Sequence, residues 1–135
     1  MYRRFAKELT EDLLACSGKL DRSVAIIQSS SNPDFFQKYR TSVGQVMGLF
    51  YLEILRDVFR LYPDLEPKIT ERAEPPIESS ESALDLVSET QSLMCDIRKR
   101  LQIAPSGDDP RIREAIESAL SMVQEIADLL PQSRP

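Results

Sequence analysis

The chain has 135 residues, of which 41% are apolar, and its 17 Lys and Arg against 22 Asp and Glu give a net charge of −5. This size and composition predict one domain, residues 1–135, with its own hydrophobic core. The acidic balance argues against nucleic acid or an anionic membrane surface as a partner, and the absence of His removes the usual ligand or base of most metal and acid–base sites.

The first predicted helix covers about residues 2–29. Its apolar residues recur at spacings of three and four, which is the period of one helix face: they are Phe5, Leu9, Leu13, Cys16, Leu20, Val24 and Ile27. A second helix is predicted over about residues 33–62, with Asn32 as its N-cap and Pro33 at its first position. Because few residues separate the two helices, we expect a long antiparallel hairpin.

The second predicted helix carries more apolar surface than one side of a small bundle needs. With about 100° between successive residues, one face holds Phe36, Val43, Met47, Phe50, Ile54, Val58 and Leu61. Further residues widen that face beyond the usual stripe: they are Tyr51, Leu55, Phe59 and Tyr62. Such a helix is either central to its own bundle or shared with a second chain.

The predicted interaction surface lies on this second helix and consists of Gly44, Gly48, Tyr51, Leu55, Phe59 and Tyr62. Glycines four residues apart would let another helix approach closely, although close packing within the monomer explains the same spacing. Burying the surplus apolar face against a second copy predicts a homodimer.

One cation interrupts the predicted apolar face. Arg40 projects near Phe36, Val43 and Met47, where a charge is unfavourable unless it is paired. Across the hairpin the nearest acid is Asp21, which suggests a buried pair of Arg40 and Asp21. The alternative is an Arg40 side chain that extends toward the end of the bundle and keeps its charge in water.

Beyond the second helix, residues 63–79 form a linker rich in prolines and charges, which predicts a crossover. A third helix is predicted over about residues 80–103 and a fourth over about residues 110–130, each with apolar residues at helical spacing. The pattern predicts an all-α fold, a four-helix bundle built from a long antiparallel hairpin, a Pro-rich crossover and a second, shorter hairpin.

No constellation of residues specifies a reaction, so the chain is predicted not to be an enzyme and to bind no cofactor or metal. Carboxylate pairs such as Glu53 and Asp57 recur on solvated helix faces without holding a metal. The basic residues 98–100 fall in the last turns of the third helix, where cations complement the helix dipole. Cys16 and Cys95 are too few for a disulfide framework, which favours a cytoplasmic location. No stretch predicts a membrane span.

Three functions remain open. The first is a non-enzymatic helical protein–protein interaction or regulatory module that self-associates through the second helix. One alternative is a bundle that binds a small apolar ligand between its helices, in a cavity lined by Met47, Met94 and Met122. The other is an acidic chaperone or inhibitor of a basic partner protein. The first requires only the surplus apolar surface and the acidic exterior, and both are present in the sequence.

Overall fold

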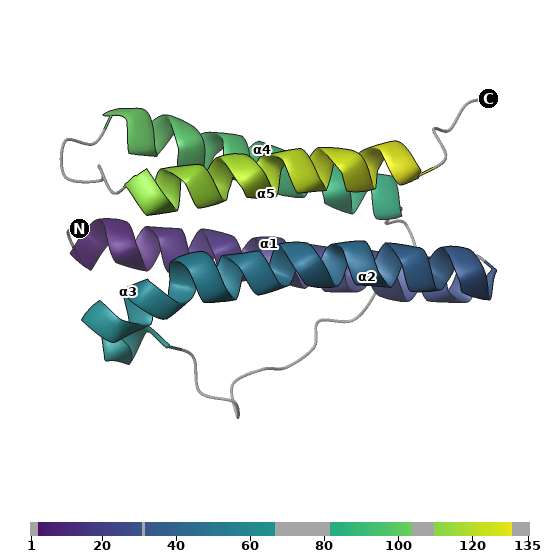
Figure 1. The fold of residues 1–135 in the computed structure, drawn as a ribbon, viewed down its shortest axis with the longest axis horizontal. Coiled ribbons are helices and arrows are strands. Elements are labelled where there is room, and N and C mark those ends of the chain that lie inside the picture. The colour runs from purple at the N-terminus through teal and green to yellow at the C-terminus, as the bar shows by residue number, and fades with distance from the viewer. Residues whose placement is uncertain (1–2, 31, 67–81, 104–109, 131–135) are drawn as a thin grey trace.

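The structure is a computed structural model that describes residues 3–30, 32–66, 82–103 and 110–130. It consists of four helical rods arranged in two layers (Figure 1). One layer holds α1 (Arg3–Ser30) and a composite rod of α2 (Pro33–Leu49), the π-helical segment η1 (Phe50–Leu55) and α3 (Arg56–Leu61), followed by the 3₁₀ turn η2 (Pro63–Leu65). The other layer holds α4 (Ala83–Ile103) and α5 (Pro110–Leu129). The all-α four-helix bundle predicted from the sequence is confirmed.

The helices bury their apolar faces against one another. Helix α1 packs against α2 and α4, and α5 packs against α2 and α4. The core draws on all four rods, with each of the following side chains 2% exposed or less: Leu13, Leu20, Val43, Phe50, Val87, Met94, Ile116 and Val123. Full burial of one such side chain stabilises the fold by roughly 1.5–3 kcal/mol, so this shared core holds the two layers together.

Polar side chains fix the starts of two helices. The Asn32 side chain accepts a 2.8 Å hydrogen bond from the Phe35 N–H, and Pro33 opens α2, as predicted. Ser82 Oγ accepts a 3.1 Å hydrogen bond from the Asp85 N–H at the start of α4. Residues 67–79 of the predicted crossover, and the predicted helix start at residue 80, lie outside the described residues.

The second rod is not the single continuous α-helix predicted for residues 33–62. In η1 the Arg56 N–H donates to the carbonyl oxygen of Tyr51, five residues earlier rather than four, and the rod bends between α2 and α3 (Figure 1). A π-helical turn holds one extra residue, which rotates every later side chain by roughly 100° relative to an uninterrupted α-helix. The core-facing residues of α3 are therefore not the ones predicted by extending the period of about 3.6 residues from α2.

This rotation accounts for much of the surplus apolar surface. The buried residues of α2 are Tyr39, Val43 and Val46. Beyond the middle of η1 the buried residues are Ile54, Leu55, Val58 and Phe59. A projection with one constant period places these two sets on different sides of the helix, so the apolar face looks too wide for one bundle. In the structure both sets face the same core.

Two expectations about single residues are also wrong, because both assumed one helical period from residue 33 to residue 62. Leu61, predicted on the core face, is 61% exposed. Arg40, predicted to interrupt that face, is exposed, because the side of α2 that is buried is centred nearer to its neighbour Tyr39. Asp21 is exposed as well. The predicted buried charge at Arg40 and Asp21 is therefore wrong.

Candidate interaction surface

The six residues of the predicted interaction surface do not lie on one surface. Leu55 and Phe59 belong to the core, with exposures of only 1% and 7%. Tyr62 is half-buried, and the guanidinium carbon of Arg3 lies 5.7 Å from the centre of its ring. The burial of Leu55 and Phe59 follows from the extra residue in η1, which turns both toward the core. These three residues are not available to a partner as an open apolar strip.

Gly44 and Gly48 lie on a side of α2 that is open in the described structure. A Cβ atom added at either position would meet no heavy atom within 4 Å. Close packing within the described part of the monomer therefore does not explain these glycines. A glycine inside a helix costs roughly 1 kcal/mol relative to Ala, so two of them in successive turns weaken α2 without an evident gain in the single chain.

We call Thr41, Gly44, Gln45, Gly48 and Leu52 the α2 outer surface. Gly44 and Gln45 lie three and four residues after Thr41, Gly48 lies four and three residues after these two, and Leu52 lies four residues after Gly48, so the five share one side of the helix. Leu52 is 58% exposed, and next to it Tyr51 is 43% exposed. Helix α2 packs against α1 and α5, and none of the described helices covers its outward side (Figure 1).

The α2 outer surface has no charged residue along its length. From Thr41 to Leu52 the sequence contains no Asp, Glu, Lys or Arg. The outward side of a surface helix is normally charged or polar, whereas depletion of charge marks the centre of protein interfaces. Exposed charges frame the stretch, with Lys38 and Arg40 before it and Glu53 and Arg56 after it. The absence of charge is visible in the sequence, but the pattern of apolar residues alone does not reveal it.

Polar contacts fix the end of the composite rod, one within the rod and one to α1. The Tyr51 hydroxyl donates to Glu66 Oε1 at 3.3 Å. Arg3 forms an ion pair with Asp64, and this hydrogen bond lowers the pKa of the Asp64 carboxyl. Both partners of that pair are more than half exposed, so the contribution to stability is small. These contacts still give Tyr51 a defined position beside Leu52.

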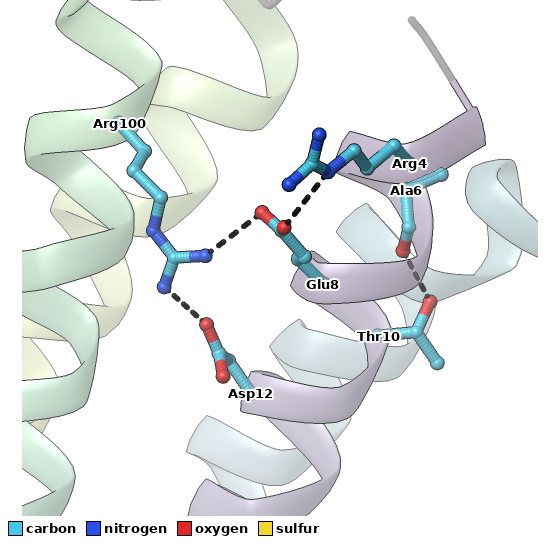
Figure 2. A network of polar contacts seen from close by, with 6 residues as sticks. All are labelled: Arg4, Ala6, Glu8, Thr10, Asp12 and Arg100. Atoms are coloured by element: carbon cyan, nitrogen blue, oxygen red, sulfur yellow. Dashed lines mark hydrogen bonds and ion pairs between the residues drawn. The ribbon is translucent and has the colours of Figure 1, made fainter.

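A second polar cluster joins α4 to α1 (Figure 2). Arg100 donates to Glu8 Oε2 at 3.4 Å and to Asp12, while Arg4 Nε lies 3.6 Å from Glu8 Oε1. Burial lowers the pKa of Arg100, but the Asp12 and Glu8 carboxylates raise it more. The expected role of Arg100 was to complement the helix dipole; the structure shows that it also links two helices.

Two side chains with reactive groups, Cys16 and Tyr39, are fully buried. Burial, with a smaller contribution from the nearby Asp12, raises the pKa of the Cys16 thiol from 9.0 to about 12, so the thiol is protonated near neutral pH and is a poor nucleophile. The Tyr39 hydroxyl donates to Ser23 Oγ at 2.7 Å, and Ser23 Oγ donates to the Leu20 carbonyl at 2.6 Å. Burial also raises the pKa of Tyr39.

A hollow between α1 and α4 is too small for a bound ligand. It is lined by Phe5, Leu9, Ile97 and Arg100 and has no space for even one water molecule. Met94, expected to line a ligand cavity, is fully buried in the core. In the described ranges no three Cys, Asp or Glu residues are grouped so that they could hold a metal ion. None of the helices described there has the length and apolarity to cross a membrane.

No protein-family model, curated protein or solved structure matches this chain. The class that the structure defines is an all-α four-helix bundle. Its function must therefore be inferred from the physical character of its surfaces.

Proposed function

We propose that this chain is a non-enzymatic protein–protein interaction module that binds through the α2 outer surface. The observation that carries the proposal is a charge-free, outward-facing stretch of helix that exposes Leu52 and places Tyr51 beside it. Exposed apolar side chains that adjoin uncharged surface are typical of binding sites. The proposal includes the cytoplasmic location favoured by two unpaired cysteines.

The glycines of the α2 outer surface suit a partner that is itself helical. The distance between two packed helices depends on the side chains at their contact, and small residues allow the closest approach. Gly44 and Gly48 present one such contact over a full helical turn, with Leu52 one turn further along. A helix packed against this surface would bury Leu52 and would place the two glycines at the helix–helix contact.

Helix α4 provides a contrasting surface within the same molecule. Its exposed residues include Asp85, Glu89, Asp96 and Lys99, which are distributed along the helix as expected for a side that faces water. The α2 outer surface differs from α4 in lacking charge, although both helices border the same core. Its composition therefore supports a binding role for α2 rather than a general property of this bundle.

Site-specific photo-crosslinking tests the proposed function. A photoreactive amino acid replaces Leu52 in one variant and the exposed Ser118 of α5 in a control variant. After irradiation in purified form and in extract from the source cells, we expect a discrete adduct with another protein chain from position 52 and none from position 118. The absence of an adduct at position 52, or the same adducts from both positions, would contradict the proposed function.

A further inference from the structure

We infer that the partner bound by the α2 outer surface is a second copy of this chain, packed antiparallel across a two-fold axis near the level of Val46. The inference rests on the proposed function, because it uses the same surface. The order of the exposed charges at the two ends of this surface points to a second copy. An antiparallel two-fold arrangement brings each end of α2 against the opposite end of the partner's α2, so charges at the two ends face each other.

The positions of these charges are complementary under that rotation. At 1.5 Å per residue, Lys38 lies about 12 Å before the level of Val46, and Glu53 lies about 10 Å beyond it. Lys38 of one copy therefore comes opposite the partner's Glu53, and the pair occurs twice in the dimer. Further out, Asp34 lies about 18 Å before this level and Arg56 about 15 Å beyond it, which places opposite charges within reach again.

All four of these charged residues are free to pair across an interface. Asp34, Lys38, Glu53 and Arg56 are exposed, and within the described part of the chain none of them forms an ion pair. A parallel dimer would instead set Lys38 against the partner's Lys38 and Glu53 against the partner's Glu53. Like charges in such positions repel, so the charge order selects the antiparallel arrangement.

The glycines fit the same axis. Val46 lies midway between Gly44 and Gly48, so Gly44 of one copy comes opposite the partner's Gly48. Two α2 backbones can then approach closely, because neither glycine adds a side chain to the contact. The axis also brings Leu52 to the level of the partner's Arg40 and its neighbour Thr41, where the exposed leucine side chain would be covered. One axis thus accounts for the open glycines, the exposed leucine and the charge pairs of Lys38 with Glu53 and of Asp34 with Arg56.

A charge-reversal cycle, measured as the dimer dissociation constant by sedimentation, tests this inference. Lys38→Glu and Glu53→Lys each place like charges together at two sites in the dimer, and we expect either change to raise the dissociation constant about tenfold. The double variant restores opposite charges, so its constant should return to within about threefold of the original. A Lys99→Glu control on α4 should leave the constant unchanged. Single variants without effect, or a double variant weaker than both, would overturn the inference.

A steric test uses the glycines. Gly48→Leu should abolish the dimer, whereas Gly18→Leu in α1 should leave it intact. A Cβ atom at either position meets no heavy atom within 4 Å in the chain, so both variants should keep the cooperative unfolding of the folded monomer. A dimer that survives Gly48→Leu would contradict the inferred axis.

The outcomes separate this inference from the proposed function. A chain that stays monomeric while position 52 crosslinks to a different protein overturns the second copy and retains the interaction module. A monomer whose position 52 crosslinks only within its own chain, for example to residues 67–81, overturns both. A dimer that dissociates with Lys38→Glu and re-forms in the double variant supports both.

Discussion

The Ser23 hydroxyl provides the hydrogen-bond acceptor for a second hydroxyl inside the core. It is fully buried, donates to the Leu20 carbonyl and accepts the hydrogen bond of the buried Tyr39 hydroxyl. The interaction joins α1 to α2 close to the turn of the hairpin. A polar interruption of the apolar face was predicted in this region, at Arg40 instead of its neighbour Tyr39, because one helical period was assumed through residue 62.

Substitutions at Ser23 and Tyr39 should lower the free energy of unfolding by different amounts. Ser23→Ala leaves the Tyr39 hydroxyl buried without its acceptor, and we expect a loss of about 1–3 kcal/mol in the free energy of unfolding. Tyr39→Phe removes the donor but leaves Ser23 bonded to the Leu20 carbonyl, so the loss should be closer to about 1 kcal/mol. Urea unfolding followed by circular dichroism measures both values. A larger loss for Tyr39→Phe would contradict the hydrogen-bond order.

Cys16 should be inert in the folded protein. Its pKa of about 12, raised mainly by burial, keeps the thiol protonated at pH 8. In a Cys95→Ser variant, where only Cys16 can react, a thiol reagent at pH 8 should give no rapid reaction until denaturant is added. Rapid labelling of the native variant would show that Cys16 is accessible.

The same thiol predicts a dependence of stability on pH. The folded pKa of Cys16 is raised above the ordinary value of 9.0, so the folded state holds the proton more tightly than the unfolded state does. Its stabilising effect is therefore present below about pH 9 and is lost as the pH rises toward 12. A Cys16→Ala variant should lose less stability over this interval than the original chain, when both are unfolded in urea at each pH. An equal loss would contradict the raised pKa.

At the level of the helices, regular spacing was enough to locate all four rods, and the caps at Asn32 and Pro33 followed from local chemistry. The π-helical segment could not be foreseen, because a single inserted residue leaves no mark in composition and alters only the phase of the pattern. The inserted residue changed which candidate residues are exposed. It turned Leu55 and Phe59 into the core, whereas Gly44 and Gly48 precede η1 and keep their places on the open side of α2. Leu52, which was not predicted as part of the surface, is exposed beside Tyr51.

Deletion of one residue in η1 tests the origin of this segment. Without Leu52, the residues Ile54, Leu55, Val58 and Phe59 would follow Phe50 by three, four, seven and eight positions, which is one face of a regular α-helix. We expect the deletion to retain cooperative unfolding at concentrations where the chain is monomeric, with a stability within about 1 kcal/mol of the original.

Deletion of the exposed Ser92 provides the matched control. It lies in the middle of the regular helix α4, where the loss of one residue rotates half of the buried side chains away from the core. This variant should lose cooperative unfolding. Equal damage from the two deletions would contradict the view that η1 accommodates an extra residue.

For the whole molecule, the distribution of charge favours contact between two copies through the layer of α1 and α2. Residues 80–135 hold 6 Lys and Arg against 10 Asp and Glu, a net charge of −4, whereas residues 1–62 hold 9 against 7, a net charge of +2. Two acidic layers of α4 and α5 would repel each other. The layer with the α2 outer surface has a net charge of half that size, so two such layers repel each other less, and it carries complementary charges at the ends of this surface.

The solution mass of the unmodified chain, measured by light scattering across a dilution series, tests this account most directly. An antiparallel dimer through the α2 outer surface predicts about twice the 15.4 kDa of one chain at high concentration, with a decrease toward 15.4 kDa on dilution. A mass of 15.4 kDa at every concentration would contradict self-association and leave the α2 outer surface to a different partner.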